Sequence, residues 1–267
     1  MARIISAAVL MPVAILAVIY APPILYLIGI GLIGTVCLYE YFGLIRSIGI
    51  KIQPVFGYIV FWILLIALRQ NMFPASILVA LVMLAAFLST MWRYRQSVRD
   101  RALALMAELL GIFYFSLFLY PAYSIRYDFG DKTGLQWTLI LLIVIWAGDT
   151  AALVTGKTIG KSRFAPLLSP KKTNEGALAG LLVGVGIAVL LQRFLFPDLP
   201  MHQVIIAAFL LGIFGQLGDL AESMLKRAAE IKDSSKLIPG HGGLLDRMDS
   251  LLFSFPVLYF YLLQLYQ

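Results

Sequence analysis

Acidic and basic side chains gather in a polar stretch between two apolar segments near the C-terminal end of the sequence. One apolar segment, "LLGIFGQLGD", ends at Asp219, and the next begins with Asp246 and Asp249. Carboxylates at the ends of apolar segments are costly in a membrane, so they usually face a cavity, a counter-charge or a metal ion. Between them, the turn "PGHGG" (239–243) favours unusual backbone geometry and can present N–H groups to phosphate.

Helical spacing groups these side chains further. A helix that continued beyond the apolar segment would carry four of them on one face: Asp219, Ser223, Lys226 and Arg227. Asp246 and Asp249 are three positions apart and share a face as well. A solvated loop with Asp–Arg pairs at helix ends is the simpler interpretation, but it does not require carboxylates recessed into both apolar segments. For His241, a hydrogen-bonded turn residue is the alternative to a catalytic one.

A second polar stretch, "TGKTIGKSRFAPLLSPKKTNEG" (155–176), follows an apolar segment that contains Asp149. Its Gly-Lys-Thr and Gly-Lys-Ser triplets do not form a P-loop, because Ala151 and Thr155 stand where glycine is needed and no strand precedes. What remains is a set of cations suited to a phosphate-bearing ligand: Lys157, Lys161, Arg163, Lys171 and Lys172. No zinc-binding or serine-hydrolase motif is present in the sequence, whereas carboxylates beside cations favour magnesium-dependent phosphoryl or nucleotidyl transfer.

The rest of the sequence must hold these residues in a membrane. Of the 267 residues, 61% are hydrophobic and 13% are charged, and the mean hydropathy is +0.91. These values predict an all-α polytopic membrane protein with one membrane domain and about nine spanning helices. The expected helices cover about 4–20, 23–39, 54–69, 74–91, 103–124, 136–155, 176–195, 203–221 and 248–265. Cys37 is the only cysteine, so no intramolecular disulfide is possible.

The distribution of Lys and Arg predicts the orientation. Nine spans place 17 of these residues on one side and 4 on the other. The positive-inside rule then puts the N-terminus and both polar stretches in the cytoplasm. A cleaved signal peptide at the N-terminus is the alternative, but Pro22 and Pro23 followed at once by another apolar segment favour a turn between two retained helices. We expect residues 1–135 to form a lipid-facing scaffold and residues 136–267 to carry the catalytic helices and loops.

With these residues identified, the sequence resembles the CTP:phosphatidate cytidylyltransferases, also called CDP-diacylglycerol synthases. The resemblance covers roughly residues 145–250. The matching positions of its signature are Ser223, Lys226-Arg227, Lys232-Asp233, Pro239, His241-Gly242-Gly243, Asp246-Arg247 and Asp249. The companion motifs are Asp149-Thr150, Ser169-Pro170-Lys171-Lys172-Thr173 and Glu175-Gly176. The sequence departs from the family at Asn174, where an aromatic residue is usual, and at Thr155-Gly156-Lys157, where Phe-Gly-Arg is common.

The resemblance implies transfer of a cytidylyl group from CTP to phosphatidate at the cytoplasmic face of the cell membrane. We expect Asp219 and Asp246 to hold Mg²⁺, and the sequence leaves a second cation open. The expected catalytic residues are Asp219, Ser223, Lys226, Arg227, Lys232, Asp233, His241, Asp246, Arg247 and Asp249. The expected substrate-binding residues are Asp149, Ser169, Lys171, Lys172, Thr173, Gly242 and Gly243. The expected partners are membrane lipids and a second copy of the chain in a homodimer, and no nucleic acid.

The lipid substrate keeps its tails in the bilayer, so we expect a cavity open to the cytoplasm and, between helices, to the lipid. Two other functions remain open at this stage. A CTP-dependent polyprenol or phytol kinase would need a base for its alcohol acceptor and would release CDP. A transporter would also use recessed charges, but no inverted repeat is visible and the charges lie on one side rather than at the midplane.

Overall fold

The computed structural model of the chain describes residues 2–92, 97–235, 237 and 242–266. Over these residues it has one helix for each of the nine predicted apolar segments, together with one short hairpin. In chain order the elements are α1 (Ala2–Tyr20), α2 (Pro23–Ser47), α3 (Pro54–Gln70), α4 (Ala75–Met91), α5 (Val98–Tyr127), α6 (Asp131–Thr158), β1 (Arg163–Ala165), β2 (Ser169–Thr173), α7 (Asn174–Phe194), α8 (Met201–Ala228) and α9 (Leu245–Tyr266). The predicted helical membrane fold is confirmed.

The helices differ in how well they match a bilayer. Six of them, α2 and α5 to α9, are long and apolar enough to cross a membrane. Helices α3 and α4 have 17 residues each. At 1.5 Å per residue they are about 26 Å long, slightly less than the ~30 Å hydrocarbon core. Length and composition therefore support six of the predicted crossings, and the other three stay predictions.

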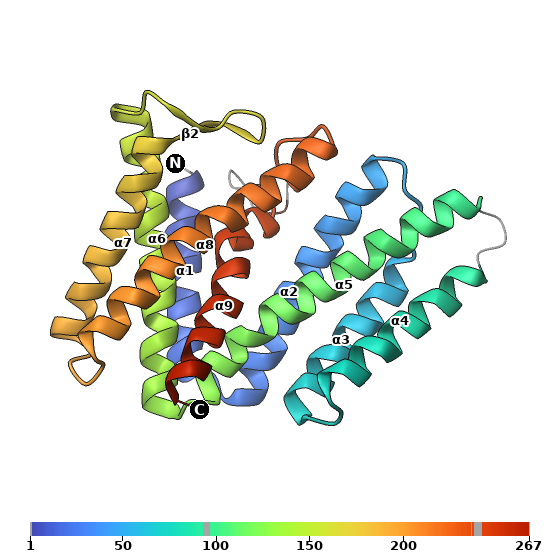
Figure 1. The fold of residues 1–267 in the computed structure, drawn as a ribbon, viewed down its shortest axis with the longest axis horizontal. Coiled ribbons are helices and arrows are strands. Elements are labelled where there is room, and N and C mark those ends of the chain that lie inside the picture. Colours follow the sequence, from blue (N-terminus) through green and yellow to red (C-terminus); the bar gives the residue numbers. More distant parts are fainter. Residues whose placement is uncertain (1, 93–96, 236, 238–241, 267) are drawn as a thin grey trace.

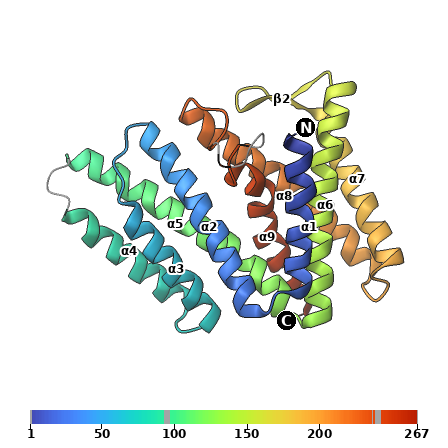
Figure 2. The ribbon, with the colours of Figure 1, turned by 180° about the vertical axis from the view of Figure 1, so that it is seen from behind.

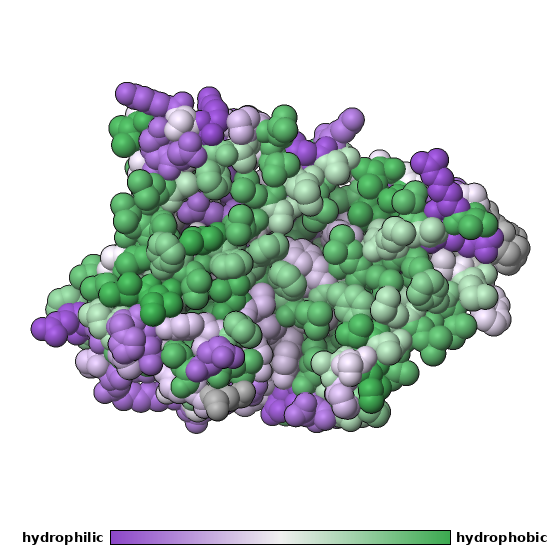
Figure 3. Space-filling model, in the orientation of Figure 1, coloured by the Kyte–Doolittle hydropathy of each residue, from purple (hydrophilic) through white to green (hydrophobic). Residues whose placement is uncertain are grey.

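The polar connections lie together at one end of the bundle. In Figure 1 the hairpin and the α2–α3 and α8–α9 connections are at the top, near the N-terminus, while the C-terminus is at the bottom. Figure 3 shows a broad apolar band across the middle of this face, with hydrophilic residues at its upper and lower edges. The two polar stretches thus share one end, as the two helices between them, α7 and α8, require. Which side of a membrane that end faces stays a prediction.

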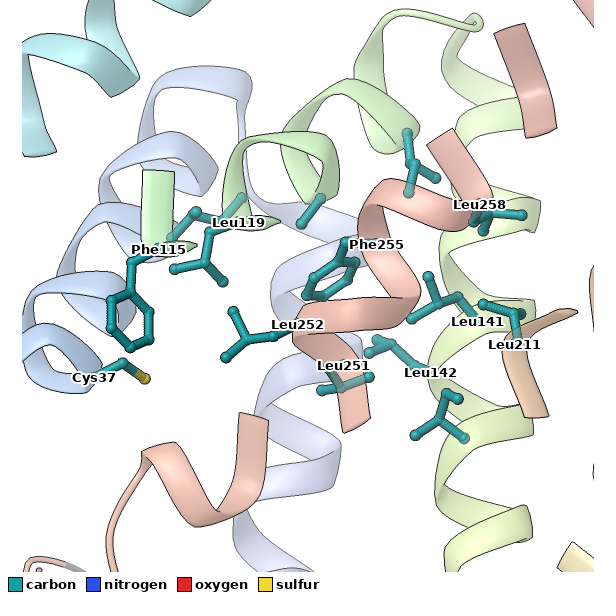
Figure 4. Packing of buried hydrophobic residues seen from close by; sticks show 14 of the residues in the cluster. Cys37, Phe115, Leu119, Leu141, Leu142, Leu211, Leu251, Leu252, Phe255 and Leu258 are labelled. Carbon is teal, nitrogen blue, oxygen red and sulfur yellow. The ribbon is translucent and has the colours of Figure 1, made fainter. Parts of the chain in front are cut away.

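Helix α9 occupies the interior of the C-terminal half. It packs between α5, α6 and α8, while α1 lies along the outer side of α6 (Figure 2). The side chains that meet around α9 are buried and apolar (Figure 4); they include Leu251, Leu252, Phe255, Leu258, Phe115, Leu119, Leu141, Leu142 and Leu211. Lipid tails are as apolar as leucine, so close packing rather than removal from lipid stabilises this arrangement. It fixes the depth of the start of α9, where Asp246 and Asp249 lie.

The β1–β2 hairpin is an element that the sequence analysis did not predict. Its strands are antiparallel, with Arg163 opposite Thr173 and Ala165 opposite Ser169. The carboxylate of Glu175, in the first turn of α7, accepts hydrogen bonds from the backbone N–H groups of Lys161 and Ser162 (both 3.1 Å). These bonds hold the base of the hairpin to α7, so the second polar stretch has a defined conformation.

Glycines allow α6 and α7 to approach closely. A Cβ atom at Gly180 would lie 2.8 Å from the carbonyl oxygen of Gly148, and one at Gly176 would lie 2.7 Å from the carbonyl oxygen of Ala152. Neither backbone can move aside without moving a whole helix. Small residues at this contact therefore set the distance between α6, which carries Asp149, and α7, which follows the hairpin.

Gly180→Ala tests this contact. We expect the added methyl group to force α6 and α7 apart and to destabilise the protein by about 1–3 kcal/mol, the usual cost of overpacking. Gly186→Ala on the same helix is the matched control, because a Cβ there meets nothing within 4 Å, and we expect it to be neutral or slightly stabilising. The thermal midpoints of the two purified variants in detergent measure the effect. Equal midpoints would show that the glycines do not set the helix distance.

Candidate active site

Three acidic side chains from α8 and α9 converge at the polar end of the bundle. Asp219, Glu222 and Asp249 each offer a carboxylate oxygen, and these oxygens lie within 4.8 Å of one another. We refer to these three residues as the acid group. Helix α9 reaches α8 here because residue 218 is glycine: a Cβ at Gly218 would lie 2.4 Å from the carbonyl oxygen of Asp249. The predicted convergence of acids from the two apolar segments is therefore present.

Lys226 links the acid group to Asp246. Its Nζ pairs with Glu222 one helical turn earlier and lies 2.6 Å from Asp246 Oδ1 on α9. The Glu222 side chain is 1% exposed and that of Asp246 is 5% exposed. Two carboxylates so deeply placed require a nearby positive charge. Because α8 continues to Ala228, beyond the predicted end at residue 221, Lys226 lies on the helix and shares the face of Asp219.

The second oxygen of Asp246 organises the turn before α9. Asp246 Oδ2 accepts hydrogen bonds from Ser234 N (2.9 Å), Ser234 Oγ (2.9 Å) and Gly243 N (2.8 Å). Gly242 has φ +79°, and a Cβ there would lie 2.6 Å from Asp246 Oδ2. Glycine is therefore required at position 242 for conformation and for space. Gly242 and Gly243 lie against the Asp246 carboxylate, and a role for the turn in binding phosphate stays a prediction.

The hairpin brings cations to the same place. Lys172 Nζ, on β2, lies 2.6 Å from Asp219 Oδ2. Arg227 Nε, on α8, donates to the carbonyl oxygen of Leu168 in the hairpin turn at 3.1 Å. Ser223 Oγ is 3.4 Å from Asp219 Oδ1, a weak contact one turn along α8. The two polar stretches, far apart in the sequence, thus meet at Asp219.

Thr173 is placed as the N-cap of α7. Its hydroxyl oxygen accepts a hydrogen bond from Gly176 N at 3.1 Å, and the residue is 5% exposed. Unpaired N–H groups at a helix start are stabilised by such a side chain. Thr173 therefore has a structural partner of its own, and its predicted contact with substrate stays a prediction.

The other predicted residues lie around this centre. Asp149 is exposed and lines a narrow pocket of about 20 Å³, enough for one water molecule, together with glycines of α7 and α8. Ser169 begins β2 and is half-buried. Four residues have exposed side chains: Lys171, Lys232, Asp233 and Arg247. His241, predicted to be catalytic, lies outside the described residues.

Sequence reasoning missed three residues of this region. Glu222 belongs to the acid group, and its position between Asp219 and Lys226 on one helix face was a usable signal. Glu40 lies in the middle of α2 and accepts hydrogen bonds from the residues around the start of α9. An acid within an apolar segment was the signal for Glu40. Ser234 joins the two carboxylates, Glu40 and Asp246, and had no distinguishing pattern.

The fold and this site define a class of protein. Clustered carboxylate oxygens can hold a hard divalent cation, the lysines can neutralise phosphates, and both lie at the polar end of a membrane-helix bundle. Such a centre suits transfer of a phosphate-bearing group at a membrane surface. A model of the cytidylyltransferase family matches residues 1–265. The chain belongs to this family.

Several relatives carry the name phosphatidate cytidylyltransferase. The protein from Bacillus subtilis (strain 168) is 42% identical over 132 residues, which is 49% of this chain and 49% of that protein. The protein from Staphylococcus haemolyticus is 35% identical over 191 residues, covering 70% of this chain and 69% of the relative. The protein from Staphylococcus aureus (strain COL) is 32% identical over 223 residues, covering 83% and 79%.

The cap at Thr173 gives a test of its structural role. We expect Thr173→Val, which keeps the shape but removes the oxygen, to cost about 1 kcal/mol of stability, as N-cap losses do. Thr173→Ser keeps the oxygen and should retain most of that stability. Thermal midpoints measured without substrate separate this effect from substrate binding. A valine variant as stable as the unmodified protein would show that the cap contributes nothing.

Proposed function

We propose that the chain transfers the cytidylyl group of CTP to phosphatidate, forming CDP-diacylglycerol and releasing diphosphate. This reaction matches the names of the relatives and the family to which the chain belongs. The observation that carries the proposal is the acid group with Lys172 and Lys226 paired beside it, at the polar end of the bundle. We further propose that this end faces the cytoplasm, where CTP is available and where the excess of Lys and Arg places it.

Magnesium fits the acid group. Its oxygen donors suit a hard cation, and buried Glu222 Oε1 has no hydrogen-bond partner among the residues that the structure describes. We propose Asp219, Glu222 and Asp249 as the residues that would hold the ion. When bound, the ion would supply positive charge against the phosphates and stabilise the charge that develops during transfer. Both oxygens of Asp246 accept bonds from protein donors, so we assign it to holding Lys226 and test its predicted role as a ligand below.

The reaction needs little acid–base help from the protein. The phosphomonoester of phosphatidate has a second pKa near 6, so at neutral pH it is mostly a dianion. One of its oxygens attacks the α-phosphorus of CTP, and the bond from that phosphorus to the oxygen leading to the β-phosphorus breaks. The electron pair leaves with diphosphate. The main task of Lys172, Lys226 and the neighbouring exposed cations is to bring two polyanions together and hold them in line.

The lipid tails must remain in the bilayer while the headgroup reaches the site. A shallow apolar groove of about 600 Å³ runs between α1, α6 and α7; its lining includes Met11, Trp146, Thr150, Val154 and Val183. Thr150 lines this groove, and the adjacent Asp149 lines the narrow pocket by α8. We propose the groove as the path of an acyl chain.

We also propose that the protein forms a homodimer and lies in the cell membrane. Residues 1–135 would then form a scaffold for the catalytic half, residues 136–267.

The fate of labelled CTP tests the reaction. Purified protein is incubated with phosphatidate, magnesium and CTP labelled at either the α- or the γ-phosphorus. We expect the α-label in the lipid product and the γ-label in diphosphate. EDTA should abolish both, and added Mg²⁺ should restore them. A γ-label in the lipid would indicate a kinase instead, and flux across proteoliposomes without turnover of CTP would indicate a transporter.

Single carboxylate-to-amide changes test the ligand set. We expect Asp219→Asn, Glu222→Gln and Asp249→Asn each to raise the Mg²⁺ concentration for half-maximal activity by about 10-fold or more, because each removes a charged oxygen ligand. Asp246→Asn should lower kcat with a smaller change in Mg²⁺ dependence. If Asp246→Asn instead shifts the Mg²⁺ dependence as strongly as Asp219→Asn, then Asp246 is a ligand as the sequence predicted. Activity near that of the unmodified protein with unchanged Mg²⁺ dependence would remove Asp246 from the site.

A further inference from the structure

Glu40 is a buried acid in the N-terminal half that contacts the catalytic half. It lies within α2, is 2% exposed, and has apolar neighbours along much of its helix. Four donor groups lie within hydrogen-bond distance of its carboxylate. Ser235 Oγ (2.6 Å) and Leu244 N (3.0 Å) donate to Oε1. Leu245 N donates to Oε2 (2.7 Å), and Ser234 Oγ lies 3.0 Å from the same oxygen. All four partners lie in the polar stretch between α8 and α9 or at the first residue of α9.

Two of these bonds cap α9 from another helix. Leu245 is the first residue of α9, and Leu244 accepts the first bonds of the helix from Arg247 N and Met248 N. The N–H groups at a helix start have no partner within the helix and carry partial positive charge. Glu40 supplies a negative charge and two acceptors to them, although it precedes them by 204 and 205 residues. The first turn of α9 is thereby fixed to α2.

A chain of contacts leads from Glu40 to the acid group. Ser234 Oγ lies within hydrogen-bond distance of Glu40 Oε2 (3.0 Å) and of Asp246 Oδ2 (2.9 Å), and its single proton serves one of them at a time. Asp246 Oδ1 holds Lys226, and Lys226 pairs with Glu222. Removing the charge of Glu40 would therefore disturb the carboxylate that orients Lys226.

Gly243 packs closely against Ser234 and Glu40. A Cβ added at Gly243 would lie 2.0 Å from Ser234 Oγ and 2.4 Å from Glu40 Oε2. The carboxylate of Glu40 thus fits directly against the backbone of the Gly-rich turn. A displacement of the carboxylate would be transmitted to the turn and to Asp246.

We propose that Glu40 is a positioning residue for nucleotidyl transfer. It fixes the start of α9 and residues 234–235, so that Asp246 faces Lys226 and Asp249 lies beside the other two members of the acid group. This proposal rests on the proposed function. Misplacement of reacting groups by about 1 Å can cost about 100-fold in rate. Loss of the Glu40 charge should therefore lower kcat, which depends on this alignment, more than it weakens the binding of CTP. The N-terminal half is then part of the catalytic apparatus and not only a scaffold.

Glu108 offers a matched control within the same half. It is 0% exposed, lies in α5, and its Oε1 accepts a bond from Gln53 N (2.5 Å), at the N-cap of α3. Glu108 therefore also places a buried carboxylate at the start of another helix, but that helix carries none of the predicted site residues. Glu40→Gln and Glu108→Gln each remove the charge of one buried carboxylate that accepts a backbone N–H bond at or beside a helix start.

The experiment compares these variants by kinetics and by hydrogen exchange. We expect Glu40→Gln to lower kcat by about 10- to 100-fold with KM for CTP changed by less than about threefold, and to speed amide exchange at residues 242–249. Glu108→Gln should leave kcat and the exchange at residues 242–249 within about twofold of the unmodified protein. Each protein is measured at the same interval below its own thermal midpoint, so that a loss of stability does not enter the comparison. Glu40→Asp, which keeps the charge, should recover part of kcat, and it carries the test if Glu40→Gln does not fold.

Several results would overturn the proposal. They are an unchanged kcat in a folded Glu40 variant, an equal loss of kcat in Glu108→Gln, or unchanged exchange at residues 242–249. The exchange measurement uses neither CTP nor lipid. If the unmodified protein failed to make CDP-lipid, the proposed function would fail, while the exchange data would still show whether Glu40 fixes the start of α9.

Discussion

The pairing of Lys226 with Glu222 and Asp246 is the interaction on which the site depends. It joins α8 to α9 and supplies positive charge to two carboxylates that are almost fully removed from solvent. Removing one partner of such a buried set leaves an uncompensated charge, which is far more costly than the net worth of the pairing. The helices must therefore meet so that Lys226 reaches both acids. Gly218 permits this, since a side chain there would press against the backbone at Asp249.

The same constraint explains why polar contacts extend through the whole membrane domain. A recessed carboxylate must find donors, and in an apolar bundle these come from helix starts and from serines of the connections. Asp246 takes backbone and hydroxyl donors from the turn before α9, while Glu40 takes them from the turn and from α9 itself. The acids thereby fix residues 234–235 and 243–245 beside the start of α9. The hairpin is held in a similar way by Glu175 and by Arg227.

Hydrogen bonds of Glu40 link the two halves of the chain, 1–135 and 136–267. α2 belongs to the first half by sequence, but Glu40 contacts the start of α9 directly. The close approach of α6 and α7 through Gly148 and Gly180, in turn, sets the distance between α6, which carries Asp149, and α7, which follows the hairpin. The candidate site itself is assembled from α8, α9 and the hairpin, and Glu40 of α2 holds the start of α9. Its geometry is a property of the bundle and not of one segment.

The sequence by itself determined the membrane class, the existence and order of the nine helices though not all their ends, and the gathering of Asp219, Asp246 and Asp249 with their cations at one end. It could do so because long apolar segments in lipid must be helical, and because helical period and segment ends are local properties of the chain. Only the tertiary structure decided which carboxylates meet. It placed Glu222 in the acid group, gave Asp246 to Lys226 and the turn, capped α7 with Thr173, and brought Glu40 to a helix about 200 residues away. These pairings depend on how close the helices pack and how they are rotated, which is set by contacts between side chains distant in the sequence.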